Sequence, residues 1–260
     1  MCGIVGYIGD KGAGPLLLEG LKRLEYRGYD SAGVAVMNGN GVETRKAAGK
    51  ISRLETVLNA LPIAGTVGIA HTRWATHGAP NECNAHPHVS MDGTVAVVHN
   101  GIIENFTLLR SKLQALGYKF VSETDTEVLA HLIQEAYEDS LEQAVMDALS
   151  QVEGTYGIAV VSSRDPNKLV AARQGSPLLI GLGEGEYYVA SDVSAILAHT
   201  RQVVYLDDGD IAVLDRKGYR VFDNDAREMR RSVSKVDWDL GQIERGGYSH
   251  FMLKEIFEQP

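Results

Sequence analysis

The chain begins with the stretch Met1-Cys2-Gly3-Ile4-Val5-Gly6, which places a cysteine in position 2. Cells remove an initiating methionine when a small residue follows it, and removal of Met1 leaves Cys2 with a free α-amino group. Such an amine has a reference pKa of about 7.7–8.0, so part of it is neutral at pH 7 and can act as a base. N-terminal nucleophiles of the threonine type place base and nucleophile on one residue in this way. Cys2 is therefore a candidate nucleophile, and the alternative interpretation is a small buried hydrophobe.

The composition is that of an ordinary globular protein with an acidic surface. The 260 residues are 44% hydrophobic and 23% charged, which fits one large domain or two small ones. A net charge of −9, from 25 basic and 34 acidic residues, argues against nucleic acid and anionic membranes as partners. No apolar run approaches about 18 residues, and the N-terminus lacks the pattern of a secretory signal. With only two cysteines, these features predict a cytoplasmic protein.

Hydrophobic periodicity predicts alternating strands and helices in the first half of the chain. Short apolar runs predict strands over residues 3–9, 33–37, 67–71 and 95–99. Apolar residues at helical spacing predict helices over residues 15–24, 106–116, 128–136 and 141–149. The third of these helices is preceded by Thr124-Asp125-Thr126-Glu127, which has the spacing of a capping box.

The second half has the pattern of a meandering antiparallel sheet. Glycine-bounded apolar runs predict strands over residues 156–162, 168–172, 178–182, 187–190, 203–206 and 210–214. Residues 181–185 are rich in glycine and predict a hairpin rather than a nucleotide-binding loop, because no helix follows them. Residues 223–234 are strongly charged and predict a surface excursion, and residues 251–257 predict a last helix. Many strands with a few long helices favour two packed sheets with helices outside.

A second group of candidate residues follows the predicted strand over residues 67–71. The sequence His71-Thr72-Arg73-Trp74-Ala75-Thr76-His77-Gly78 places an arginine where a strand ends and a loop begins. Such an arginine can hold a carboxylate with two parallel hydrogen bonds. The alternative interpretation is that Arg73 pairs with a structural acid while Trp74 caps the core.

A third group is Asn100-Gly101, between two apolar runs. Asn-Gly in this setting is a strong hairpin signal. The same tight turn can also present the Asn100 side-chain amide and the Gly101 N–H as the two donors of an oxyanion hole.

Asp125 is a fourth candidate, in the predicted first turn of a helix. A carboxylate there interacts favourably with the helix dipole, which explains it without any ligand. It can equally hold the ammonium group of a substrate.

Four residues of metal-ligand type, His77, Cys83, His86 and His88, lie within twelve residues. Their spacing matches no zinc pattern, and two prolines interrupt them. We expect no metal here and interpret the segment as an ordered loop that lines a pocket.

Four motifs occur together in one order: residues 2–6, 71–78, 99–105 (HNGIIEN) and 122–127 (SETDTE). In this combination the whole chain resembles the class II glutamine amidotransferase domains, which are N-terminal nucleophile hydrolases. The resemblance implies an α+β fold, a four-layer αββα sandwich of two mainly antiparallel sheets. It implies hydrolysis of L-glutamine to glutamate and ammonia, with no cofactor.

The resemblance also implies a role for each motif residue. Cys2 would be the nucleophile, with its own amine as base, and Asn100 and Gly101 would form the oxyanion hole. Arg73 would bind the α-carboxylate of glutamine and Asp125 its α-amino group. The remaining positions would line or support the pocket: Trp74, Thr76, His77 and, with a supporting role, Arg27.

Two further stretches narrow the resemblance within the family. Residues 24–33 (LEYRGYDSAG) and 254–260 (KEIFEQP) are similar to the branch that uses glutamine ammonia to make glucosamine 6-phosphate from fructose 6-phosphate. We therefore expect an amidotransferase domain over residues 1–240, and over 241–260 a helix and the start of a linker to a sugar-isomerase region that this chain lacks. The full-length enzyme is expected to be a homodimer. The alternatives are the phosphoribosyl amidotransferase branch and a non-catalytic module that senses glutamine.

Overall fold

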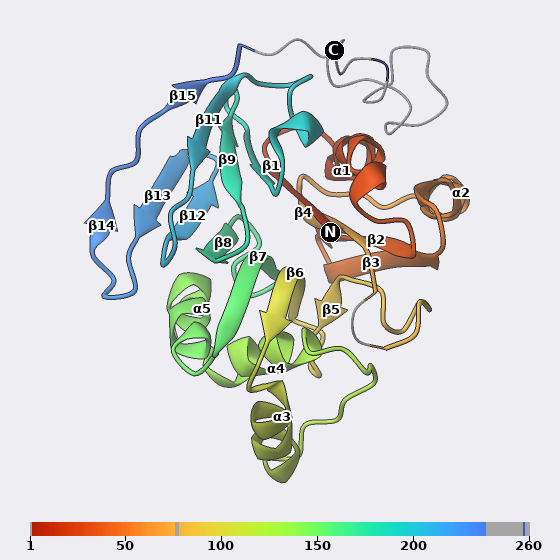
Figure 1. The fold of residues 1–260 in the computed structure, drawn as a ribbon, viewed down its shortest axis with the longest axis vertical. Coiled ribbons are helices and arrows are strands. Elements are labelled where there is room, and N and C mark those ends of the chain that lie inside the picture. The colour runs from red at the N-terminus through yellow and green to blue at the C-terminus, as the bar shows by residue number, and fades with distance from the viewer. Residues whose placement is uncertain (1, 76–77, 238–256, 258–260) are drawn as a thin grey trace.

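The structure is a computed structural model that describes residues 2–75, 78–237 and 257. These residues form two antiparallel sheets with helices on their outer sides (Figure 1). The first sheet has the strand order β15-β11-β9-β10-β1-β4-β2-β3. Its strands are β1 (Gly3–Ile8), β2 (Ser31–Asn38), β3 (Gly41–Ala48), β4 (Val67–Arg73), β9 (Leu179–Leu182), β10 (Tyr187–Ala190), β11 (Gln202–Tyr205) and β15 (Ser234–Lys235).

The second sheet has the order β14-β13-β12-β8-β7-β6-β5. Its strands are β5 (His88–Val89), β6 (Val95–Ile103), β7 (Gly154–Ser162), β8 (Leu169–Gln174), β12 (Ile211–Asp215), β13 (Gly218–Phe222) and β14 (Glu228–Met229). The helices are α1 (Ala13–Arg23), α2 (Ile51–Ala60), α3 (Phe106–Ala115), α4 (Glu127–Glu135) and α5 (Leu141–Leu149), with short 3₁₀ turns η1 (Glu25–Arg27) and η2 (Val193–Ala195). No helix within the described part of the chain is both long and apolar enough to cross a membrane.

Three buried clusters show that the layers are stacked as helix, sheet, sheet and helix. One cluster joins α1 and α2 to the outer face of the first sheet, and another joins α3, α4 and α5 to the outer face of the second. The third lies between the two sheets. Alternation along β1 explains the division, since Val5 and Tyr7 face the helices whereas Ile4 and Ile8 face the other sheet. The predicted α+β sandwich is confirmed.

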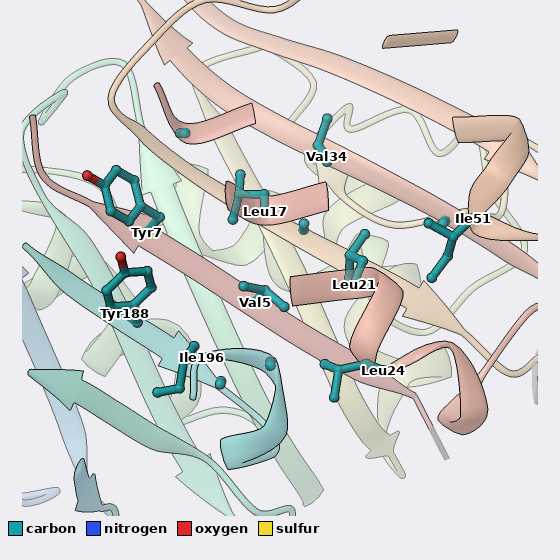
Figure 2. Packing of buried hydrophobic residues seen from close by; sticks show 14 of the residues in the cluster. Val5, Tyr7, Leu17, Leu21, Leu24, Val34, Ile51, Tyr188 and Ile196 are labelled. Atoms are coloured by element: carbon teal, nitrogen blue, oxygen red, sulfur yellow. The ribbon is translucent and has the colours of Figure 1, made fainter. Parts of the chain in front are cut away.

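Helix α1 illustrates how the predicted pattern becomes packing. Leu17 and Leu21 are fully buried and lie over Val5 of β1 (Figure 2). Burial of each leucine contributes about 1.5–3 kcal/mol. Pro15 falls within the first turn of the helix, where a missing N–H breaks no helical hydrogen bond.

The Asn100-Gly101 pair does not form the predicted hairpin. Strand β6 continues through it to Ile103, and Asn100 pairs with Gly157 of β7. Gly101 has φ +134°, so the flexible residue distorts the strand instead of reversing it.

The predicted single meander after residue 154 is also wrong. Strands β7, β8 and β12 join the second sheet, whereas β9, β10 and β11 join the first. Local alternation marks a strand but not the sheet to which it belongs. The predicted glycine-rich hairpin does form, because Leu182 pairs with Tyr187 across residues 183–186.

The start of α4 differs from a capping box. The helix begins at Glu127 with Thr126 as N-cap, and the side chain of Thr126 makes no cap hydrogen bond. The Glu127 carboxylate instead accepts hydrogen bonds from the backbone N–H groups of Val121 and Ser122, at 2.8 and 2.7 Å. The acid therefore orders the loop before the helix, and Asp125 lies in that loop rather than in the first turn.

The charged segment over 223–234 does lie at a margin of the structure. It contains β14, an edge strand of the second sheet, and reaches β15, an edge strand of the first. Of the helix predicted over 251–257, all but the last residue lies outside the described residues, as does most of the predicted linker.

Candidate active site

A cavity of about 260 Å³ opens between the two sheets, where β1 begins and β4 ends. It brings together residues from motifs that are far apart in the sequence. The predicted site residues that line it are Cys2, Arg27, Arg73, Trp74, Asn100, Gly101 and Asp125. Thr76 and His77 lie outside the described residues, so their predicted place in the pocket stays a prediction.

Cys2 immediately precedes β1 and lies beside the end of β4. The register pairs Gly3 with Thr72, which brings the backbone N–H of Trp74 to 3.2 Å from the Cys2 Sγ as a donor. Burial raises the pKa of the Cys2 thiol, while the Trp74 N–H and the charge of Arg73 lower it. Because the net direction is upward, the thiol is mostly protonated at neutral pH and needs a base before it can attack.

Asn100 approaches Cys2 from the opposite sheet. Its Nδ2 donates to the Cys2 carbonyl at 3.3 Å. The next residue, Gly101, has φ +134°, and a Cβ there would collide with the Thr155 carbonyl of β7. The two predicted oxyanion donors are thus held beside Cys2 by a strand distortion that only glycine accommodates, not by a turn.

Arg73 is the last residue of β4 and is only 4% exposed. Its guanidinium donates to the backbone carbonyls of Gly78 and Ala79, each at 3.5 Å. Burial lowers the pKa of Arg73, and the nearby thiol of Cys2 and the carboxylates of Asp125 and Asp30 oppose that shift. Arg73 therefore places a buried cation in the cavity wall.

Trp74 does not cap the core, as the alternative interpretation of this motif required. Its side chain is 45% exposed, and its ring meets the Tyr29 ring edge-on at a centroid distance of 5.5 Å. The tryptophan lines the mouth of the cavity instead.

Asp125 is 5% exposed and lines the same cavity as Arg73. Its Oδ2 accepts a hydrogen bond from the backbone N–H of Ile103 at 2.9 Å. Its Oδ1 has no hydrogen-bond partner among the described residues, so one carboxylate oxygen is left for a ligand. Since Asp125 precedes the N-cap Thr126, an interaction with the helix dipole alone does not account for it.

We expect Asp125→Asn to weaken the use of glutamine but barely to affect an analogue that lacks the α-amino group. Asparagine keeps an oxygen for the Ile103 N–H and loses only the negative charge. The measurement is kcat/KM for both substrates in the wild type and the variant. Equal losses on both substrates would show that Asp125 does not hold the ammonium group.

Arg27 lines the cavity from η1 and pairs with Asp192, the N-cap residue of η2. Its Nη1 lies 2.7 Å from Asp192 Oδ2. The segment packs tightly on the end of β4, because the Thr72 hydroxyl donates to the Gly28 carbonyl and a Cβ on Gly28 would lie 2.8 Å from the Arg73 carbonyl carbon. The role of Arg27 stays a prediction.

Several residues that line the cavity were not predicted. They are His71, His99, Thr124, Thr126, Ser176 and Pro177, whereas His86 belongs to the segment that we expected to line a pocket and does line this one. The motifs over residues 71–78, 99–105 and 122–127 contain four of them, His71, His99, Thr124 and Thr126, so the neighbouring motif residues are a usable signal. Ser176 and Pro177 follow β8 in the sequence Gly-Ser-Pro, which marks a loop but not the cavity that the loop reaches.

The residues of metal-ligand type do not converge. His86 and His88 are buried, with ring centroids 4.8 Å apart, whereas Cys83 is exposed and donates to the Val121 carbonyl at 2.7 Å. Within the described residues, no group of three or more His, Cys, Asp or Glu side chains is placed to hold a metal ion. His77 lies outside them.

The fold and the site define a class of proteins. Residues 59–237 match the family model described as "Glutamine amidotransferase domain", and the chain belongs to this family. Among solved structures, it resembles the glutamine phosphoribosylpyrophosphate amidotransferase of B. subtilis, solved with ADP and GMP. That likeness has a TM-score of 0.76 at 26% identity and covers 88% of this chain and 50% of that one.

More similar relatives carry one name. The chain is 55% identical over 260 residues to the glutamine–fructose-6-phosphate aminotransferase (isomerizing) of Clostridium tetani, and 55% identical over 267 residues to that of Chlorobaculum tepidum. All of this chain and 43% of each relative are covered. The chain thus spans less than half the length of the curated relatives that it matches.

Proposed function

We propose that this chain hydrolyses L-glutamine to glutamate and ammonia through a thioester on Cys2. One observation carries the proposal: a thiol at the start of β1 shares a cavity with a buried cation, a buried carboxylate and two candidate oxyanion donors. Arg73 and Asp125 offer opposite charges for the two ends of an amino-acid head group. Family membership supports glutamine as that amino acid.

The proposed reaction begins with a proton transfer. Once Met1 is removed, the α-amine of Cys2 takes the thiol proton, through a water molecule because amine and thiol of one residue meet at a poor angle. The thiolate attacks the side-chain amide carbon of glutamine. The oxygen of the tetrahedral intermediate becomes negative and is stabilised by Asn100 and Gly101, a contribution of about 2.7–4 kcal/mol per donor in other enzymes.

The intermediate then collapses in the direction of products. The protonated amine donates to the leaving nitrogen, the C–N bond breaks, and ammonia departs. Water then attacks the γ-glutamyl thioester, the C–S bond breaks, glutamate is released, and the free thiol of Cys2 is regenerated. Arg73 and Asp125 hold the head group throughout, which would discriminate glutamine from simple amides.

The test combines a mass measurement of the N-terminus with an assay of ammonia release. We expect chains without Met1 to release ammonia from glutamine and chains that retain Met1 to be inactive, because only the former have the amine beside the thiol. Glutamine binding with no ammonia release by processed chains would instead favour a glutamine-sensing module.

For the longer protein, we propose that the ammonia is used to make glucosamine 6-phosphate from fructose 6-phosphate in a C-terminal sugar-isomerase region. The names of the relatives at 55% identity support this branch. The residue divisions 1–240 and 241–260, the homodimer and a cytoplasmic location are part of the same proposal. Both cysteines are free thiols, which supports a reducing compartment. A longer protein that transfers ammonia to phosphoribosyl pyrophosphate, and not to fructose 6-phosphate, would contradict it.

A further inference from the structure

Behind the candidate oxyanion donors lies a buried histidine that the proposed reaction does not use. His71 is fully buried in β4, and its Nε2 lies 3.0 Å from Asn100 Oδ1 across the space between the sheets. We propose that His71 is a positioning residue that orients the Asn100 amide so that its N–H faces the reacting oxygen. This inference rests on the proposed function, in which Asn100 stabilises the oxyanion.

Hydrogen-bond chemistry fixes the orientation of the Asn100 amide. The Cys2 carbonyl can only accept, so the Asn100 atom that faces it at 3.3 Å is Nδ2. The other amide atom, Oδ1, is therefore the one that faces His71. An amide oxygen can only accept, so His71 Nε2 carries the hydrogen of this bond.

With Oδ1 of Asn100 bonded to His71, the Nδ2 group faces away from His71 and keeps one hydrogen for the substrate. Nδ2 has two hydrogens, and one is used by the Cys2 carbonyl. The second has no partner among the described residues, and Asn100 lines the cavity. If the amide turned over, an oxygen lone pair would replace this hydrogen and would repel the developing negative charge.

The ring of His71 is held in place from behind. It stacks on the His86 ring with a centroid distance of 4.1 Å and an interplanar angle of 21°. His86 Nδ1 accepts a hydrogen bond from the backbone N–H of His99 at 3.3 Å. Since His99 immediately precedes Asn100 in β6, the stack links the end of β4 to the strand that carries the oxyanion donors.

Burial also keeps the His71 ring neutral. It lowers the pKa of His71 to about 3, and the hydrogen bond to Asn100 opposes the shift. His71 Nδ1 is buried and has no described partner, as expected for a neutral ring whose single hydrogen is on Nε2. A leucine would fill similar space, so the donor to Asn100 is what the histidine adds.

The test compares His71→Leu and His71→Gln with a matched control, His131→Leu. His131 is 1% exposed and does not line the cavity. Its Nε2 lies 3.2 Å from the Lys119 carbonyl oxygen, and its Nδ1, like that of His71, has no partner among the described residues. Loss of either histidine therefore perturbs a buried position, although His131 Nε2 also lies 3.6 Å from Glu127 Oε1. Only His71 touches the candidate oxyanion site.

For His71→Leu we expect kcat for glutamine to fall roughly 10- to 100-fold, with KM within about threefold of the wild type, because the amide acts in the transition state. Glutamine at position 71 keeps an N–H donor and is expected to restore part of kcat. Affinity for a γ-aldehyde analogue of glutamate, which forms a tetrahedral adduct with the thiol, should fall with kcat. His131→Leu should lose thermal stability and keep kcat.

The proposal is overturned if folded His71→Leu keeps kcat, or if His131→Leu loses kcat to the same extent. Should His71→Leu fail to fold, ¹⁵N NMR of the wild-type protein decides: a hydrogen on Nε2 supports the proposal, and one on Nδ1 overturns it. Processed wild-type chain that releases no ammonia would contradict the proposed function instead, and the tautomer would still report on the His71–Asn100 bond.

Discussion

Replacing Cys2 with alanine is expected to abolish glutamine hydrolysis while leaving the fold intact. Alanine is small enough for Met1 still to be removed, so the variant keeps the α-amine and loses only the thiol. Without a nucleophile no thioester can form, and losses of about 10⁴- to 10⁶-fold in kcat are typical of such changes. The measurement is ammonia release by chains whose N-terminus has been verified by mass.

The second cysteine provides a matched control for this experiment. Cys83 is exposed, is not among the residues that line the cavity, and donates to the Val121 carbonyl, a bond that serine can also make. We expect Cys83→Ser to keep both activity and stability. A Cys2→Ala variant that still releases ammonia at an appreciable rate, or a Cys83→Ser variant that loses activity and releases a metal, would contradict the assignment of Cys2.

Local sequence is sufficient for elements whose pattern is strong. The apolar run after Cys2 predicts β1, and the leucines at helical spacing predict α1, because the apolar residues of both elements are buried against a neighbouring layer. Strand β3 is not predicted: its residues are mostly half-buried at a sheet edge, so its sequence lacks a strong apolar pattern. Pattern alone also cannot decide that Asn100-Gly101 stays in a strand, since that depends on pairing with β7, more than fifty residues later.

The site is predictable in its parts but not in its geometry. The order of the motifs and the family resemblance are enough to group Cys2, Arg73, Asn100 and Asp125 in one site. The bonds that hold them, such as Asp125 to the Ile103 N–H, depend on how one sheet is placed on the other. No local pattern contains that information, and the same holds for the contact between His71 and Asn100.

Replacing Arg73 with alanine is expected to lower kcat/KM for glutamine by about 30-fold to several thousand-fold, mainly through a higher KM. Arg73 is almost fully buried in the cavity wall, where a charge-assisted bond to a carboxylate is poorly screened by water. Removing one partner of such a pair typically costs about 2–5 kcal/mol. Steady-state kinetics with glutamine, together with thermal unfolding, measures the effect.

Two further variants make this result specific to the α-carboxylate. Arg73→Lys keeps the positive charge but loses the planar fork, so its kcat/KM should lie between those of the wild type and Arg73→Ala. Arg45→Ala removes an arginine that pairs with Glu43 on β3, away from the cavity, and should leave the kinetics unchanged. If Arg73→Ala lowered kcat alone and left KM for glutamine as it is, the arginine would act on the reacting amide rather than on the head group. An unchanged KM for glutamine, together with a normal melting temperature, would therefore show that Arg73 does not bind the substrate. The proposed selectivity of the cavity for an amino acid would then lose the positive charge on which it depends.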